Sequence, residues 1–127
     1  IDLHVEVVPV TFDEMTAQRK TESSADIRAR VVKARDRQLE RFKSLSGIYT
    51  NAMMPSNQVK EVCAINEAGR NLLKTAMERL GLSARAYDRI LKVSRTIADL
   101  ADADDIRIEH LAEAIQYRSL DRDGWAG

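Results

Sequence analysis

The chain has 127 residues, with 20 basic and 20 acidic side chains, so its formal net charge is zero. This balance excludes a globally basic nucleic-acid-binding protein, although local basic patches remain open. Hydrophobic residues make up 44% and aromatic residues only 5%, which is typical of one small soluble domain with an aliphatic, helix-rich core. No apolar run approaches the roughly 18 residues of a membrane span, so none is expected.

The first residues predict a short strand. Apolar and polar residues alternate over Ile1–Val7, the pattern of a strand with one apolar face. Because a lone strand is unstable in water, it either pairs with a sheet that this chain lacks or is frayed. The sequence opens on Ile1 and not on methionine, which we interpret as a piece cut from a longer chain, with removal of a leader as the alternative.

The rest of the chain, after a polar segment over Thr11–Glu22, predicts helices joined by short turns. Asn66 and Ser83 are N-cap residues, and Gly47 and Gly81 are expected helix stops. The expected helices are Ser24–Leu45, Gln58–Ala64, Glu67–Leu80, Ala84–Ala101 and Glu109–Arg118, with a loop over Asn51–Asn57 and an extended segment at Ile106–Ile108. We therefore predict an all-α bundle of four to five helices with a short N-terminal strand remnant.

The helix after Ser83 has the broadest apolar surface. On a helical wheel its apolar residues cover roughly half of the circumference, which favours a helix in the middle of the bundle. The opposite face carries the polar residues Arg85, Asp88, Arg89, Lys92, Arg95, Thr96 and Asp99.

Arg85 is the candidate functional residue of this helix. It lies in the first turn, where the helix dipole disfavours a cation, and four residues before the like charge of Arg89. A phosphate bound to Arg85 would offset both penalties. The competing interpretation is that Asp88 neutralises Arg85, and the residue pattern alone favours it.

Several segments of the chain resemble one known family. Leu82–Leu100 and Ile108–Arg118, together with Ser23–Val31, Arg37-Gln38, Arg41-Phe42 and Asn51-Ala52-Met53, resemble the C-terminal domain of magnesium-chelatase-like proteins of the ComM type. The resemblance combines separate segments over nearly the whole chain, so we regard it as specific. It implies the helical lid of an AAA+ ATPase, in which residues 1–22 end the ATPase core and connect it to the lid, 23–118 form the lid, and 119–127 form a flexible tail.

The resemblance also implies a role for Arg85. This residue is similar to the sensor-2 arginine of AAA+ ATPases, which reaches the γ-phosphate of ATP within its own subunit or across to the next. On that ground we prefer the phosphate role for Arg85, and we assign no catalytic role to Arg89 or Arg95. The implied partners are the protein's own N-terminal ATPase core and neighbouring subunits of a homo-oligomeric ring, a hexamer.

The chain lacks the motifs of a complete ATPase. It has no Gly-x-x-x-x-Gly-Lys-Ser/Thr phosphate loop and no apolar strand ending in paired acids that would hold magnesium. We therefore expect ATP and magnesium to be cofactors of a full-length protein, with neither bound by this chain alone. ComM-type proteins are associated with ATP-driven DNA translocation, whereas their chelatase relatives insert magnesium into porphyrin, and the segments quoted above favour the ComM side.

The remaining reactive side chains indicate no site. His4 and His110 are far apart in sequence and have no cluster around them, so no metal site is expected. We expect His110 to be a surface or capping residue. The single cysteine, Cys63, fits a buried structural role and a cytoplasmic protein.

The first predicted helix supports an alternative function. Over Ser24–Leu45, seven basic residues outnumber three acidic ones, so a free-standing module could bind DNA or protein through this helix. A solvated helix, or one facing an acidic neighbouring domain, explains the same charges, and we prefer it because no aromatic residues are interleaved for base stacking.

Overall fold

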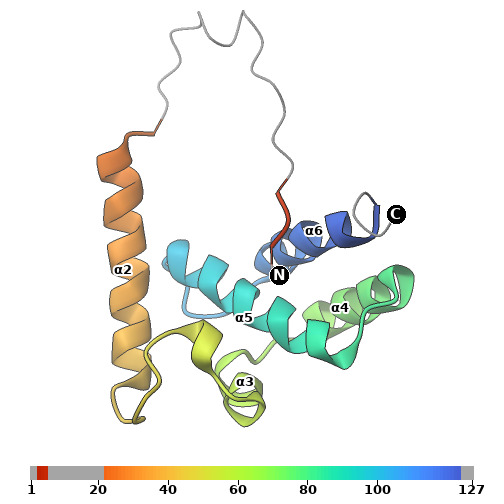
Figure 1. Ribbon diagram of the computed structural model, residues 1–127, viewed down its shortest axis with the longest axis horizontal. Coiled ribbons are helices and arrows are strands. Elements are labelled where there is room, and N and C mark those ends of the chain that lie inside the picture. The colour runs from red at the N-terminus through yellow and green to blue at the C-terminus, as the bar shows by residue number, and fades with distance from the viewer. Residues whose placement is uncertain (1–2, 6–21, 124–127) are drawn as a thin grey trace, which may run out of the picture.

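A computed structural model describes residues 3–5 and 22–123 of the chain, with side chains as far as Arg118. This part contains five α-helices and one 3₁₀ turn (Figure 1). They are α2 (Ser24–Phe42), η1 (Asn51–Met53), α3 (Ser56–Val62), α4 (Glu67–Leu80), α5 (Ala84–Leu100) and α6 (Ile108–Asp123). The all-α bundle predicted from the sequence is confirmed.

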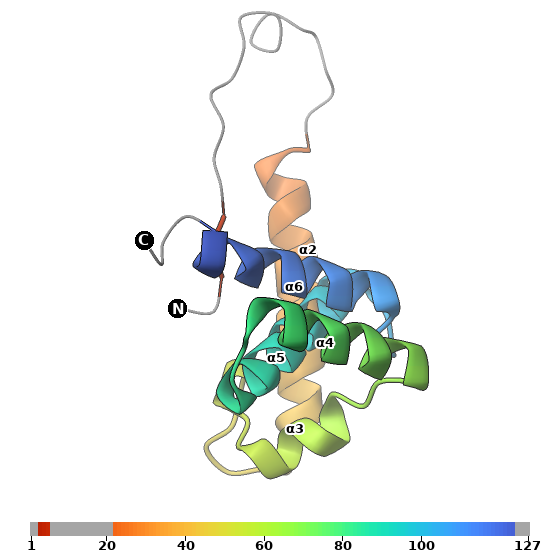
Figure 2. The same cartoon turned by 90° about the vertical axis from the view of Figure 1, so that its right-hand side faces the viewer.

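The predicted central helix, α5, is in the middle of the bundle. It packs against α2, η1, α3 and α6, and α4 packs against α6 (Figures 1 and 2). The core is mostly aliphatic, and its largest fully buried apolar side chains are Phe42, Leu73, Ile90, Leu111 and Val59. The apolar arc of α5 therefore meets neighbours on several sides, as its breadth predicts.

Helix α2 begins where the sequence predicts and ends earlier. The Oγ atom of Ser23 accepts a hydrogen bond from the backbone N–H of Asp26 (3.1 Å), so the N-cap is formed. The helix ends at Phe42 and not at Leu45, and Gly47 adopts its positive φ of 81° in the turn beyond. The N-terminal half of α2 projects beyond the other helices (Figures 1 and 2).

Local signals place the ends of α4 and the start of α5 as predicted. The Asn66 side chain accepts from Gly69 N–H (2.8 Å), and Gly81 follows α4 with φ 62°, the left-handed conformation that glycine adopts without a steric penalty. Helix α5 ends at Leu100, one residue before the expected end. Gly69 also allows α4 to approach α6, because an added Cβ would lie 2.8 Å from Cδ1 of Leu111.

The remaining expected bounds need correction. Helix α3 starts at Ser56, directly after Pro55, and the loop expected before it contains the 3₁₀ turn η1. Helix α6 begins at Ile108, so this residue is helical and not extended. Residues 119–123, expected to belong to a flexible tail, continue α6, because neither glycine nor proline occurs between Arg118 and Gly124. Residues 124–127 lie outside the described part of the chain.

Residues 3–5 lie against α5 and α6. Of the expected strand Ile1–Val7, the structure describes residues 3–5, which are not assigned as a strand. The backbone N–H of His4 donates to the carbonyl of Tyr117 in α6 (3.0 Å). Leu3 and Val5 line a groove of about 360 Å³ whose apolar wall includes Val93, Ile97 and Leu100 of α5. Pairing with a helix carbonyl leaves no ladder in which residues 3–5 could form a strand.

Within the described residues, no helix combines the length and the apolar character that crossing a membrane requires.

Candidate functional site

Arg85 lies in the first turn of α5, at the end of the helix that follows the Gly81 turn. Ser83 is the N-cap residue, and its Oγ atom accepts from the N–H of Ala86 over a long 3.4 Å. The Arg85 side chain is exposed and forms no hydrogen bond or ion pair with any residue that the structure describes. A cation thus stands at the positive end of a helix dipole without a described partner.

The neutralising contact that competes with a phosphate role for Arg85 is not formed. The carboxylate of Asp88 accepts a hydrogen bond from Oγ of Ser56 in α3 (2.7 Å), and Arg85 and Asp88 form no ion pair. The residue pattern favoured this ion pair, and the structure contradicts it because α3 supplies Asp88 with another partner. The guanidinium of Arg85 is therefore available to an external anion.

The C-terminal half of the polar face of α5 is buried and not solvated. Arg95 is 4% exposed and Asp99 1% exposed, because α2 and the loop after α5 cover them. The helical wheel placed both on the outer face, so this part of the sequence-based interpretation is wrong. Lys92 and Thr96 are half-buried as well, since the Nζ atom of Lys92 donates to the Ala52 carbonyl (3.2 Å).

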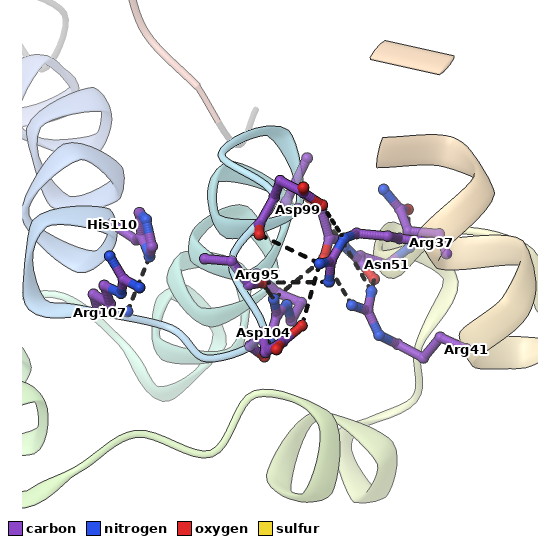
Figure 3. Close-up of polar contacts among 12 residues, drawn as sticks. Arg37, Arg41, Asn51, Arg95, Asp99, Asp104, Arg107 and His110 are labelled. Carbon is purple, nitrogen blue, oxygen red and sulfur yellow. Dashed lines mark hydrogen bonds and ion pairs between the residues drawn. The ribbon is translucent and has the colours of Figure 1, made fainter. Parts of the chain in front are cut away.

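Asp99 is the centre of a buried polar network (Figure 3). Its carboxylate accepts two hydrogen bonds from Arg41 of α2 (2.9 and 2.7 Å) and one from the side-chain amide of Asn51 (2.9 Å). Arg95 forms an ion pair with Asp99 (3.2 Å) and donates to the carbonyls of Ala103 (2.7 Å) and Asp104 (2.9 Å). Burial is the main cause that lowers the pKa of the Arg95 guanidinium.

A second, exposed cluster joins α2 to the loop after α5. The carboxylate of Asp102 accepts from Lys33 Nζ (2.7 Å) and from Arg37 Nε (2.9 Å), and Arg37 also reaches Asp104 (3.2 Å). The hydrogen bond from Lys33, followed by that from Arg37, lowers the pKa of the Asp102 carboxyl. Two of the basic residues of α2 that suggested a binding surface, Lys33 and Arg37, therefore hold α2 on this loop.

The two clusters explain several segments that carry the family resemblance. Arg37 and Arg41 anchor α2, Gln38 accepts from the backbone N–H of Asn51 through Oε1 (2.9 Å), and Asn51 donates to Asp99. These residues are structural. Sequence reasoning missed the network around Asp99, and the one local signal was the spacing of Arg95 and Asp99, four residues apart on one helix.

The other candidate residues are also structural. Cys63 is a free, buried thiol, as predicted, and burial raises its pKa to about 11. His110 is buried and not on the surface, but it does cap α6, because its Nδ1 accepts from the N–H of Arg107 (2.9 Å; Figure 3). Among the described residues, no group of three or more potential metal ligands is present.

Comparison with known proteins places these features in a family. The family model described as magnesium chelatase, subunit ChlI C-terminal, matches residues 21–118. The chain belongs to this family. It is 42% identical over 123 residues to competence protein ComM of Haemophilus influenzae, an alignment that covers 95% of the chain and 23% of that protein.

Two further relatives match the chain at the same identity over shorter alignments. The chain is 42% identical over 103 residues to protein YifB of Salmonella typhimurium and 42% identical over 101 residues to YifB of Escherichia coli. These alignments cover 81% and 80% of the chain and 19% of each relative. The chain thus spans about a fifth of the length of the curated relatives it matches, and it is a C-terminal domain of the magnesium-chelatase-like type predicted from its sequence.

Proposed function

We propose that this chain acts as the helical lid of a ring-forming AAA+ ATPase and contributes Arg85 to an ATP site as a sensor-2 arginine. ATP and magnesium are then held by an ATPase core outside this chain, and Arg85 contacts the γ-phosphate from the lid. The likeness to a competence protein extends the proposal to DNA as the substrate on which the motor works.

One observation carries the proposal. Arg85 is exposed at the start of α5, and the side chain that would neutralise it, Asp88, is bound to Ser56 instead. Guanidinium groups bind phosphate oxygens through paired hydrogen bonds, and an arginine without an internal partner keeps its donors for such a ligand. Because α5 packs against α2, η1, α3 and α6, a phosphate contact that moved Arg85 would also act on these elements.

The substitution Arg85→Ala in the full-length protein tests the role. We expect steady-state ATP turnover to fall at least about tenfold, because the substitution removes a cation that stabilises charge on the transferred phosphate. The melting temperature should stay within about 2 °C of wild type, since surface substitutions change stability little. Arg79→Ala, which removes an exposed arginine in the last turn of α4, is the matched control and should leave turnover within about twofold. Normal turnover in Arg85→Ala would refute the sensor assignment.

Mixed rings separate a role within one subunit from a role across the interface. Subunits that carry Arg85→Ala are combined with subunits that lack the phosphate-loop lysine. If Arg85 serves the neighbouring subunit, some interfaces combine an intact arginine with an intact phosphate loop, and turnover returns. If it serves its own subunit, no site in the mixture is complete and turnover stays low.

A further inference from the structure

The buried face of α2 continues past the point where the bundle ends. Ala34, Gln38 and Phe42 lie on this face and are buried against the bundle. Val31 and Ile27 continue the face one and two turns nearer the N-terminus, yet they are 39% and 44% exposed, and the neighbouring Val32 is 46% exposed. In Figures 1 and 2 no other described helix lies beside these turns. Within the described part of the chain, three branched apolar side chains are therefore left partly exposed.

The first turns of α2 also contain the basic residues of this helix that are not paired within the described part of the chain. Lys33, Arg37 and Arg41 bind carboxylates at the C-terminal end of α5 and in the loop after it, and Arg30 pairs with Glu22. Arg28 and Arg35 form no hydrogen bond or ion pair with a residue in the described part of the chain. They flank the apolar side chains, and with them and Ser24 they line a groove of about 440 Å³.

We propose that this α2 docking face (Ser24, Ile27, Arg28, Val31, Val32 and Arg35) binds an apolar patch flanked by two carboxylates on the ATPase portion of the same protein. Arg28 and Arg35 are seven residues apart, so the two carboxylates would stand about 10 Å from each other. The inference rests on the proposed function, which supplies the ATPase portion. Because the chain spans only 19–23% of its relatives, most of a protein of that length would be available as the partner.

The charges on α2 argue against a second copy of the chain and against nucleic acid as the partner of the α2 docking face. A second copy would bring the like-charged Arg28 and Arg35 of two docking faces together, and α2 has six basic residues against three acidic ones. Nucleic acid would match the two arginines, but it would place its charged backbone over Ile27, Val31 and Val32 while four of the six basic residues are already paired within the chain. An acidic protein surface with an apolar centre satisfies both parts of the docking face.

Photo-crosslinking in the full-length protein tests the proposal. A benzoylphenylalanine residue replaces Val31, and a second protein carries it at Arg79, an exposed position on α4. With no nucleotide present, we expect Val31 to crosslink to a segment of the ATPase portion that contains Asp or Glu, as mapped by mass spectrometry. The Arg79 position should not label that segment.

Charge reversal tests the chemistry of the contact. In the crosslinking protein, Arg28→Glu with Arg35→Glu should lower the yield from Val31 at least about tenfold, because opposed carboxylates repel. Changing the mapped carboxylates to lysine should restore the yield, while Arg79→Glu should leave it unchanged. Far-UV circular dichroism of each variant verifies that the helices remain folded, and rescue by the compensating change distinguishes lost contact from misfolding.

Several results would overturn the proposal. These are crosslinks from Val31 only to residues 1–22 of its own chain, crosslinks only to α2 of another subunit, or salt-sensitive DNA binding by the chain that Arg28→Glu with Arg35→Glu abolishes. The readout is independent of Arg85 because it uses nucleotide-free protein. A crosslink to the ATPase portion combined with normal turnover of Arg85→Ala would refute the sensor role and leave the docking face standing.

Discussion

At the scale of single residues, Cys63 illustrates how burial governs chemistry. Removing the thiol from water raises its pKa from 9.0 to about 11, although the nearby cations Arg95 and Arg41 partly oppose the shift. The thiolate is the reactive form of cysteine and is therefore scarce near neutral pH. Cys63 thus acts as a small apolar side chain of the core.

The raised pKa of Cys63 makes stability sensitive to alkaline pH. As the pH rises, the unfolded chain releases the thiol proton before the folded chain does. The contribution of Cys63 to the free energy of unfolding, about 3 kcal/mol, is therefore complete below pH 9.0 and is lost as the pH rises to about 11. Urea denaturation at several pH values should show a shallower alkaline decline for Cys63→Ala than for wild type. Equal declines would contradict the pKa shift.

Arg85 and Arg95 show how far the burial of single residues could be predicted from the sequence. Both lie on the polar face of α5 on a helical wheel, and only Arg95 is buried. The wheel reports the direction of a side chain from its own helix, whereas burial depends on which other helix arrives there. The residues that cover Arg95 and Asp99, among them Arg41 and Asn51, lie far away in the sequence. The exposure of Arg85 therefore agrees with the wheel, whereas the burial of Arg95 and the network around Asp99 required the structure.

At the scale of elements, polar contacts join α2 to α5 and to the loop after it. Asp99 binds Arg41 in the interior, and Asp102 binds Lys33 and Arg37 at the surface. A buried carboxylate that loses its charge leaves its arginine partners without compensation, while an exposed pair is already screened by water. The two carboxylates are therefore expected to contribute very differently.

Matched substitutions test this difference between the two carboxylates. Asp99→Asn should lower the free energy of unfolding by about 3 kcal/mol, because Arg41 and Arg95 keep their charge without a counter-charge. Asp102→Asn makes the same chemical change at an exposed site, and asparagine tolerates the positive φ of 58° there, so the urea midpoint should barely move. A similar loss of stability in both variants would show that burial does not set the strength of these pairs.

The ends of elements could be predicted where local chemistry determines them. Asn66 and Gly81 bracket α4, and its bounds agree with the sequence-based prediction. Helix α2 ends before Leu45 although that residue continues the apolar stripe, because Leu45 packs on the core from the turn after Phe42. Helix α6 outruns its predicted end because its last turns carry no apolar pattern to reveal them.

At the scale of the whole molecule, stability should decrease from α5 towards the projecting end of α2. Helix α5 contacts most of the other elements, while the first turns of α2 contact none of the described helices closely. Native-state hydrogen exchange should therefore give the greatest protection in the middle of α5 and the least over Ser24–Val31. Equal protection of both segments would contradict this gradient. The fold class followed from composition and periodicity, but this uneven distribution of contacts did not.

The position of α5 has a mechanical consequence. It is one unbroken helix of 17 residues, about 25 Å long, with Arg85 in its first turn and the α2 anchor Asp99 in its last. A helix packed against neighbours on several sides resists bending, so we expect α5 to transmit a displacement at one end to the other. If Arg85 has the proposed role, a displacement imposed there would therefore carry α2 along with α5, and the projecting end of α2 would move with them.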